Sequence, residues 1–266
     1  TIIKKELEKI KRINFFEPDP IDKKEIELVH SKEYLTRLES LSTAGAVFPD
    51  NVFSKNTFDI ALLSAAAAKS AAMNCTDNTT FALVRPPGHH AGREFFGGFC
   101  YINNIAFAAK SLQKYKGWRG MIIDIDYHHG NGTQDIFKND ESIFYLSLHA
   151  DPRYAYPRTG FESENNSHIK NIPLPLDTSD LDHIKKFEKN MKECSKLFDP
   201  EFIAVSAGFD TYSMDPIAGL QINKIETYRR IGERIASLRL PTFIVLEGGY
   251  YLRELGRMVA SFVSGF

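Results

Sequence analysis

The segment DIDYHHGNG, residues 124–132, places two carboxylates and two histidines directly after an apolar run. Asp126 and His128 are two positions apart, so in extended chain their side chains point to the same side. A carboxylate and an imidazole are both common ligands of Zn²⁺. Asp210, which follows another apolar run, is the best candidate for a third ligand. Three protein ligands leave one coordination position open for water, which is typical of a catalytic metal site.

Each of these residues also has a simpler use when it is taken alone. Asp126 could cap the turn that follows it, and His128 could be a buried histidine with satisfied hydrogen bonds. Their combination with Asp210, and with the histidine and tyrosine motifs described next, favours the metal site.

Two adjacent histidines, His89 and His90, follow a rigid proline pair in the segment RPPGHHAG, residues 85–92. Histidine titrates near neutral pH and is the usual general acid or base in enzymes. An imidazole with such a role needs a partner that fixes its tautomer. Asp124 and Asn131 flank the metal motif and could supply that partner, so we expect the histidine pair to line one wall of a pocket. A histidine-rich loop without a catalytic role would show the same local sequence.

A tyrosine follows a glycine pair in the segment LEGGYY, residues 246–251. The two glycines allow the backbone to approach a ligand closely. The hydroxyl of Tyr250 could then donate a hydrogen bond to a developing oxyanion. A tyrosine that only packs against its neighbours would have the same local sequence, so this motif alone leaves both uses open.

Short apolar runs alternate with longer amphipathic segments along the chain. The apolar runs predict strands at Phe81–Arg85, Gly120–Asp126, Ile143–His149, Phe202–Ala207 and Thr242–Glu247. The amphipathic segments predict helices at Thr57–Met73, Asn104–Lys114, Ser179–Lys196, Asn223–Ser237 and Tyr251–Val263. Capping-box spacing marks the helix starts at Ser179 and Asn223. This alternation predicts an α/β fold with a mostly parallel sheet that helices cover on both faces, and in such sheets ligands bind beyond the carboxyl ends of the strands.

Composition narrows the classes of protein and of partner. The 266 residues suit one large domain or two small ones, and a net charge of −1 gives no sign of a nucleic-acid or membrane partner. Three widely spaced cysteines suit a reducing compartment and predict no cysteine-rich metal site. No apolar run approaches the ~18 residues that a membrane span needs, and no signal peptide opens the chain. We therefore expect a cytoplasmic protein, or a nuclear one if the source is eukaryotic; the oligomeric state stays open.

Six motifs together resemble the zinc-dependent histone deacetylase family, which includes the bacterial acetylpolyamine amidohydrolases. In chain order they are RPPGHHAG, GGFCYINN, DIDYHHGNGTQDIF, SLHADP, SAGFDTYSMDP and LEGGY, within residues 85–252. The resemblance implies the arginase-like three-layer α/β/α sandwich and a single catalytic domain over residues 1–266. Members of the family open with a β-strand and a His-Pro-Glu-like segment, so it also implies that an N-terminal strand is missing from this sequence.

The resemblance assigns roles to the residues at the metal. Asp126, His128 and Asp210 match the zinc ligands. His90 matches the general base and acid, and His89 matches its electrostatic companion.

Further matched positions support these residues. Asp124 matches the carboxylate that holds the first histidine. Asn131 stands where some branches carry aspartate, and asparagine there is similar to the class II pattern. Tyr250 matches the tyrosine that binds the oxyanion.

The resemblance also implies a narrow tunnel for an acylated amine. Phe99 and Tyr156 match its aromatic walls, and Gly98 lies beside them. Ile217 sits where one polyamine-selective branch carries a glutamate. Asp50 falls where a rim aspartate contacts the substrate backbone.

Two statements about metal ions follow from the same resemblance. A structural site for a monovalent cation, usually K⁺, matches the Asp124, Ser147 and Leu148 positions together with the backbone of Asp126 and His128. The related arginases bind two metal ions, but the positions of the additional carboxylates hold glycine here, at Gly130 and Gly208. The sequence therefore predicts one Zn²⁺ and no second catalytic ion.

The implied reaction is hydrolysis of the amide of an N-acetyl-lysine to acetate and a free amine. An acetylated polyamine or another small acetylated amine would fit a narrow aromatic tunnel equally well. Glu94, Glu162 and Glu164 are the candidate carboxylates for a polycationic substrate at the mouth. A zinc protein that only binds acyl-lysine is disfavoured, because His89, His90 and Tyr250 are all present.

Overall fold

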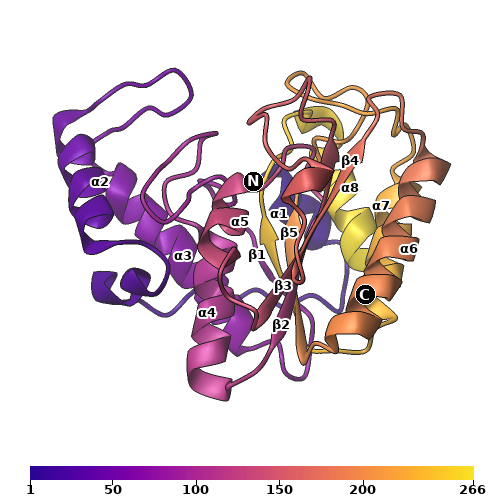
Figure 1. Cartoon of the computed structure of the whole chain (residues 1–266), viewed down its shortest axis with the longest axis horizontal. Helices are drawn as coiled ribbons and strands as arrows, with labels where there is room; N and C mark the ends of the chain where they lie inside the picture. Colours follow the sequence, from indigo (N-terminus) through magenta and orange to yellow (C-terminus); the bar gives the residue numbers. More distant parts are fainter.

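A six-stranded sheet forms the centre of the computed structural model, which describes all 266 residues (Figure 1). In sheet order its strands are β1 (Thr80–Ala82), β6 (Thr242–Leu246), β5 (Phe202–Ala207), β2 (Gly120–Asp124), β3 (Ile143–Ala150) and β4 (Ile169–Leu174). Every neighbouring pair is parallel. The predicted parallel sheet is therefore confirmed.

The strands are apolar throughout because both faces of the sheet are buried. In β2, Ile122 belongs to one large apolar cluster, whereas Met121 and Ile123 belong to another. Side chains alternate between the two faces of a strand, so the two clusters are the cores on opposite sides of the sheet.

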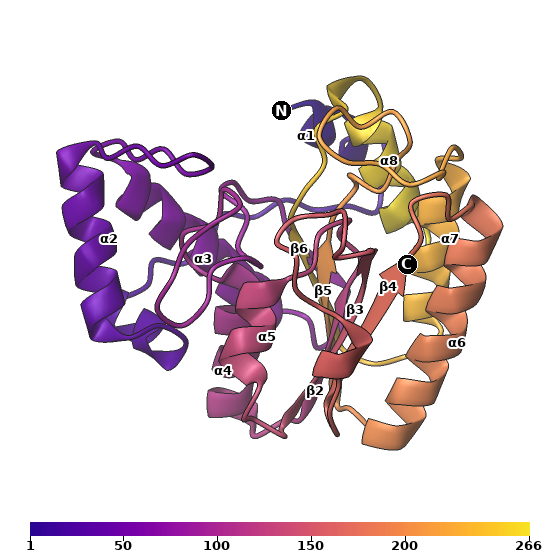
Figure 2. The ribbon, with the colours of Figure 1, turned by 45° about the horizontal axis from the view of Figure 1, so that its top comes forward.

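Helices cover both of these cores, as Figures 1 and 2 show. On one side lie η1 (Lys23–Leu28), α2 (Lys32–Ala44), α3 (Thr57–Met73), α4 (Asn104–Lys116) and α5 (Asn131–Phe137). On the other side lie α1 (Ile2–Leu7), α6 (Asp180–Phe198), α7 (Glu226–Ala236) and α8 (Leu252–Ser264). A short 3₁₀ turn, η2 (Glu162–Glu164), lies in the loop between β3 and β4. The predicted three-layer α/β/α arrangement is confirmed.

Some elements differ from the sequence prediction. The edge strand β4 was not predicted, because its sequence IKNIPL mixes polar residues with apolar ones and contains a proline. The charged pattern IIKKELEKIKRI predicted the first helix, which is α1, whereas helices α2 and α5 were not predicted. Ser179 caps α6 as predicted, and its hydroxyl accepts a hydrogen bond from the backbone N–H of Asp182.

The predicted start of α7 at Asn223 is wrong. The helix begins at Glu226, and no side chain caps it. The amide oxygen of Asn223 instead accepts a hydrogen bond from the Ser213 hydroxyl, at 2.6 Å. A contact with a distant loop has replaced the local capping bond.

The direction of the strand order changes at β2, which pairs with β3 on one side and with β5 on the other. Such a switch point leaves a crevice beyond the carboxyl ends of the two strands. The segments with the three candidate metal ligands leave β2 and β5 at this point, and those with the histidine pair and Tyr250 follow β1 and β6. None of the helices is long and apolar enough to cross a membrane. The three cysteines are buried and form no disulfide.

Candidate metal centre and active site

The three predicted metal ligands come together at the carboxyl ends of β2 and β5. One ligand atom from each of Asp126, His128 and Asp210 lies within 4.8 Å of the others. Backbone N–H groups orient both carboxylates: the N–H of Gly248 donates to Asp126 Oδ2 at 2.8 Å, and the N–H of Tyr127 donates to Asp210 Oδ1 at 2.9 Å. The remaining oxygens of the two carboxylates are thereby left to face His128.

The donor set fits a divalent cation. His128 Nδ1 lies 3.0 Å from Asp210 Oδ2 and 3.2 Å from Asp126 Oδ1, so one ring nitrogen faces two carboxylates. Asp210 Oδ2 is buried and receives no hydrogen bond of acceptable geometry. A single proton on Nδ1 cannot satisfy both oxygens, whereas a cation at their centre would. Nitrogen and oxygen donors of this kind are first choices for Zn²⁺.

The protonation equilibria reflect the crowding of these charges. Burial disfavours a charged imidazole, but the Asp126 and Asp210 carboxylates that face the ring outweigh it and raise the pKa of His128 to about 10. Burial and the neighbouring Asp126 charge raise the pKa of Asp210 to about 6. The trio therefore holds a proton tightly, and a divalent ion would displace that proton when it binds.

The two adjacent histidines have different partners. His89 Nδ1 lies 3.1 Å from Asp124 Oδ2, and Asp124 is fully buried. His90 Nδ1 lies 2.8 Å from the amide oxygen of Asn131. A neutral amide oxygen accepts the Nδ1 proton of His90, which leaves Nε2 of that ring free to accept another.

Because of this difference, the His89 ring is charged and the His90 ring is neutral. Burial lowers the pKa of His89, but the charges of Asp126 and Asp124 outweigh it and raise the pKa to about 10. Burial lowers the pKa of His90 well below its usual range, and the neighbouring His89 and His128 lower it further. His90 is therefore the neutral imidazole of the pair, as a general base must be.

Tyr250 lies at the edge of this cluster. Its ring centroid is 6.1 Å from that of Phe99, and the Arg85 guanidinium lies 5.6 Å from its centroid. Burial raises the pKa of Tyr250, and the charges of Asp210 and Asp126 raise it further. The phenol therefore keeps its proton and can act as a hydrogen-bond donor.

Two aromatic residues that the sequence suggested for a tunnel lie at the surface beside the site. Phe99 is 42% exposed and Tyr156 is 43% exposed. The Tyr156 ring lies 4.9 Å from His90 and 6.3 Å from His128, edge to face in both cases. A Cβ on Gly98 would overlap the His90 ring, so only glycine allows the backbone to pass there.

Asp50 is also at this border. Its Oδ2 accepts a hydrogen bond from the N–H of Gly98 at 2.7 Å. Gly98 and Phe99 both have positive φ, which for phenylalanine is a strained conformation. Burial raises the pKa of Tyr156, and the nearby Asp50 carboxylate raises it further. Asp50 thus supports the strained turn on one side and neighbours the tyrosine on the other.

The loop that carries Phe99 is fastened at its base by His30, which the sequence did not reveal. His30 Nδ1 lies 2.8 Å from the carbonyl oxygen of Gly92, and the N–H of Asn103 donates to Nε2 at 3.0 Å. These two bonds fix a neutral tautomer with its proton on Nδ1. Burial lowers the pKa of His30 to about 4, which keeps the ring in that form.

The residues matched to a monovalent-cation site lie on paired strands. Asp124 of β2 is opposite Ser147 of β3, and Leu148 follows. The Ser147 hydroxyl lies 2.8 Å from His149 Nδ1, which can accept its proton. The serine oxygen therefore keeps lone pairs for an ion.

Further residues of the site escaped prediction. Glu247 is fully buried, and its Oε2 accepts hydrogen bonds from the N–H groups of Gly88 and His89, at 2.7 and 3.2 Å. The Tyr145 hydroxyl donates to Asp124 Oδ2 at 2.9 Å. The one sequence feature that could have indicated Glu247 is its position at the end of an apolar run. No sequence feature indicated a role for Tyr145 in the site.

Ile217 is 54% exposed. The suggested carboxylates at the mouth are not all free. The Glu164 side chain accepts hydrogen bonds from the N–H groups of Gly160 and Phe161, at 2.8 and 3.0 Å. Glu94 and Glu162 are exposed.

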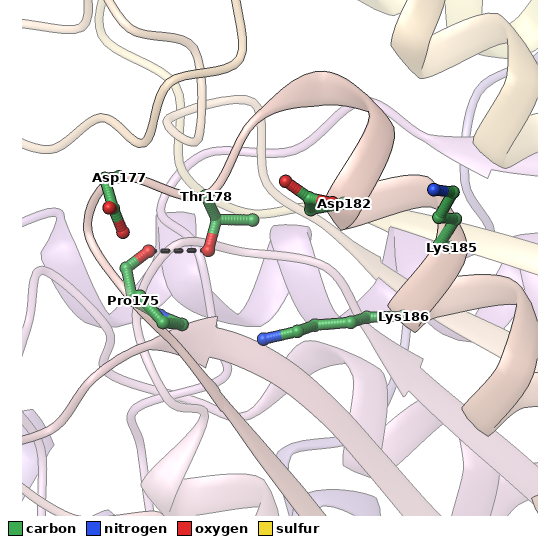
Figure 3. Close-up of a pocket in the computed structure, with 6 residues that line it drawn as sticks. All are labelled: Pro175, Asp177, Thr178, Asp182, Lys185 and Lys186. Atoms are coloured by element: carbon green, nitrogen blue, oxygen red, sulfur yellow. Dashed lines mark hydrogen bonds between the residues drawn. The ribbon is translucent and has the colours of Figure 1, made fainter.

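A separate hollow of about 360 Å³ lies beyond the end of β4, at the start of α6 (Figure 3). Its lining is polar and consists of Pro175, Asp177, Thr178, Asp182, Lys185 and Lys186. None of these residues belongs to the cluster around His128.

Comparison with known proteins agrees with this geometry. The model of the histone deacetylase domain matches residues 1–266. The acetylpolyamine amidohydrolase of Burkholderia pseudomallei is 37% identical over 220 residues, which cover 80% of this chain and 64% of that protein. Histone deacetylase 10, chloroplastic, of Oryza sativa subsp. japonica is 36% identical over 282 residues, which cover 96% of this chain and 62% of the relative. The chain thus spans less than two thirds of both curated relatives.

A solved structure is similar over the whole chain. The crystal structure of acetylpolyamine aminohydrolase from Burkholderia pseudomallei superposes with a TM-score of 0.92 at 30% identity, covering 100% of this chain and 88% of that one. The match of the family model, the shared fold and the sequence identity over most of the chain lead to one conclusion. The chain belongs to the histone deacetylase family, in the part of it that includes the acetylpolyamine amidohydrolases.

Proposed function

We propose that this protein is a zinc-dependent deacetylase that hydrolyses the amide of an N-acetylated amine to acetate and the free amine. The proposal rests on one observation. The neutral imidazole of His90 lies beside the group of three candidate ligands, Asp126, His128 and Asp210, with its ring 5.9 Å from that of His128. A metal site of three protein ligands beside a base is the usual composition of a hydrolytic metal centre. Membership of the histone deacetylase family supports the same reaction.

Asp126, His128 and Asp210 would hold the zinc ion. When bound, zinc supplies a Lewis acid that polarises the acetyl carbonyl and lowers the pKa of a water molecule. The carboxylate orientation set by the N–H groups of Gly248 and Tyr127 prepares the ligand oxygens for the ion before it arrives.

His90 is the proton carrier in this proposal. Its Nδ1 proton is held by Asn131, so Nε2 accepts the proton of the attacking water. The same nitrogen then donates that proton to the leaving amine. His89, paired with the Asp124 carboxylate, carries positive charge beside it and stabilises negative charge that develops in the transition state.

Tyr250 donates a hydrogen bond from its phenol hydroxyl to the oxygen of the acyl group as negative charge builds on that oxygen. Phe99 and Tyr156 enclose the aliphatic stem of the substrate, and Gly98, which has no side chain, leaves room for the His90 ring next to them. The Asp50 oxygen that does not bind Gly98 is the contact for the substrate backbone.

A monovalent cation, K⁺ in this proposal, would be held by the backbone of Asp124, Asp126, His128 and Leu148 together with the Ser147 side chain. The pairing of β2 with β3 supports it, because it brings Asp124 and Ser147 opposite each other. Such an ion would offset the charge of the buried Asp124.

N-acetyl-lysine in a peptide or protein is the substrate that we propose first. A polycationic amine needs free carboxylates at the mouth. The Glu164 carboxylate is occupied by backbone N–H groups and one Asp50 oxygen is bound to Gly98, which leaves Glu94 and Glu162 as the exposed candidates. Ile217 presents an apolar side chain where a polyamine-selective branch carries glutamate.

An acetylated polyamine is the second candidate, and one observation favours it. The relative and the solved structure described above are named acetylpolyamine amidohydrolase and acetylpolyamine aminohydrolase. Both candidates require the same chemistry at the metal, so they differ only in what the rim recognises.

Side-by-side kinetics of the zinc-loaded protein test the proposal, with acetyl-lysine peptides in one series and acetylated polyamines in the other. We expect acetate release from both series, with a higher kcat/KM for the peptides. Tyr250→Phe serves as the matched inactive control, because it removes one hydroxyl and keeps the ring. A higher kcat/KM for the polyamines would reverse the order of the two substrates. Absence of acetate release from every acetylated amine, with one zinc bound, would show that the protein binds acyl groups without hydrolysing them.

A further inference from the structure

The backbone of Tyr250 is held by a carboxylate from another loop. Asp215 Oδ2 accepts hydrogen bonds from the N–H groups of Tyr250 and Tyr251, at 2.7 and 3.1 Å. Asp215 is 7% exposed, so water competes little for these bonds. Hydrogen bonds from backbone N–H groups to a buried carboxylate are among the stronger ones in proteins.

The second oxygen of the same carboxylate holds a different segment. Asp215 Oδ1 accepts hydrogen bonds from the N–H groups of Ile217 and Ala218, at 3.0 and 3.2 Å. Four backbone N–H groups thus converge on one side chain. Asp215 thereby joins the turn that contains Tyr250 to residues 215–218, which carry the exposed Ile217.

The turn needs such support because of the residue before the tyrosine. Gly249 has φ of +132°, a conformation that side-chain-bearing residues rarely adopt. A glycine linkage permits many directions for the residue that follows, so the glycine pair alone does not define where the Tyr250 ring points. The bond from the Tyr250 N–H to Asp215 removes that freedom.

A second charged residue contacts the same turn. The Arg85 guanidinium donates to the carbonyl oxygen of Glu247 at 2.9 Å and lies 5.6 Å from the centroid of the Tyr250 ring. The turn therefore keeps one attachment when Asp215 is changed. We expect the fold to survive such a change while the direction of the tyrosine becomes less defined.

We propose that Asp215 is a positioning residue for Tyr250, and that it couples the rim segment 215–218 to the hydroxyl that binds the acyl oxygen. The proposal rests on the proposed deacetylase function. Asp215 touches neither the metal ligands nor, by this proposal, the reacting atoms; it acts through the backbone of Tyr250. A catalytic donor that is misplaced by about 1 Å can lose roughly 100-fold in rate.

The first test is Asp215→Asn in the zinc-loaded protein. Asparagine has the same shape, but its NH₂ group cannot accept the hydrogen bonds that one carboxylate oxygen receives. We expect kcat to fall by about 10- to 100-fold and KM to change by less than about threefold, with zinc content unchanged.

Asp180→Asn is the matched control. Asp180 at the start of α6 also accepts hydrogen bonds from two backbone N–H groups, those of Asn223 and Lys224, each at 3.2 Å. It lies in none of the segments that carry the candidate site residues. We expect its kcat to equal that of the wild type. An equal loss of kcat in both variants would overturn the proposal, because loosening any loop would then suffice.

A double-mutant cycle shows whether Asp215 acts through the tyrosine hydroxyl. In a Tyr250→Phe background, Asp215→Asn should lower kcat by less than about twofold, because the group that it positions is already absent. A full 10- to 100-fold loss in that background would overturn the proposal and give Asp215 a role independent of Tyr250.

A measurement without turnover separates this proposal from the proposed function. With 3-fluorotyrosine introduced at position 250, fluorine NMR should give one narrow resonance in the wild type and in Asp180→Asn. Asp215→Asn should broaden or split it. Identical spectra in all three proteins would overturn the positioning role, whether or not any acetylated amine is hydrolysed.

Asp215→Glu covers the case in which the asparagine variant does not fold. Glutamate keeps the charge but is longer by one methylene, so it should fold and displace the turn. We expect a shifted fluorine resonance and a reduced kcat, with Asp180→Glu as the control. A wild-type resonance and a wild-type kcat in Asp215→Glu would overturn the proposal.

Discussion

Acidification from pH 7 to pH 5 should destabilise this protein through His30, the histidine that fastens the loop carrying Phe99. Both ring nitrogens of His30 are used, one by the Gly92 carbonyl and one by the Asn103 N–H. A second proton on the ring would face that N–H group and break the bond. Protonation of His30 therefore opposes the native state directly.

The size of the effect follows from the two pKa values. Burial lowers the pKa of His30 from 6.5 to about 4 in the native state. The unfolded chain consequently takes up the proton first as the pH falls, so stability is complete above pH 6.5 and is lost progressively down to pH 4. Between pH 7 and pH 5 the loss from this one group is about 2 kcal/mol, since one pKa unit corresponds to about 1.4 kcal/mol.

Urea unfolding of the wild type and of His30→Asn at pH 7 and pH 5 measures this contribution. The variant should be less stable at pH 7, and the difference between the two proteins should shrink by about 2 kcal/mol at pH 5. Tyr34→Phe is the control. The Tyr34 ring lies 5.0 Å from that of His30 in a tilted arrangement, and its hydroxyl donates to the Tyr101 carbonyl. Burial raises the pKa of Tyr34 well above its usual range, so it does not titrate between pH 7 and pH 5. If the gap between wild type and His30→Asn is the same at both pH values, the reasoning about His30 is refuted.

Three further outcomes are expected at the active site. Asp210→Ala should bind less than one equivalent of zinc in a metal analysis, whereas the wild type should bind one; two equivalents in the wild type would contradict the assignment. His90→Ala should lose more than about 100-fold in kcat with zinc still bound, and His89→Ala should retain more activity; near-normal turnover of His90→Ala would remove it as the base. Tyr250→Phe should lose about 10²–10³-fold in kcat while Tyr251→Phe stays close to wild type; the reverse order would place the catalytic hydroxyl on the next residue.

The parts of the fold that could be predicted are those that depend on residues close together in the sequence. The apolar runs predicted the four inner strands and edge strand β1, and the polar segments after them predicted the edge of the sheet where the site lies. Asp126, His128 and Asp210 could be grouped because they follow neighbouring parallel strands. Edge strand β4 could not be found, since a strand at the edge buries less and tolerates residues such as Pro173.

Contacts between distant segments explain most of what the sequence did not reveal. His30 binds Asn103 across 73 positions, and Asp215 binds Tyr250 across 35. No periodicity or motif marks such pairs, because each side chain looks like an ordinary loop residue in its own segment. The predicted helix start at Asn223 was wrong for the same reason, because the Asn223 side chain binds Ser213 of another loop instead of capping α7.

The two glycines beside the candidate metal ligands, Gly130 and Gly208, restrict which substitutions the site can accept. A Cβ on Gly208 would overlap the Asp126 carboxylate, and a Cβ on Gly130 would overlap the Asp124 carboxylate and the Tyr145 hydroxyl. These are the positions that carry additional carboxylates in the related two-metal pattern. A single substitution that introduced a carboxylate at either position would therefore displace the Asp124 or Asp126 carboxylate of the candidate metal site. A carboxylate ligand at either position therefore requires a backbone shift in its loop as well as the substitution.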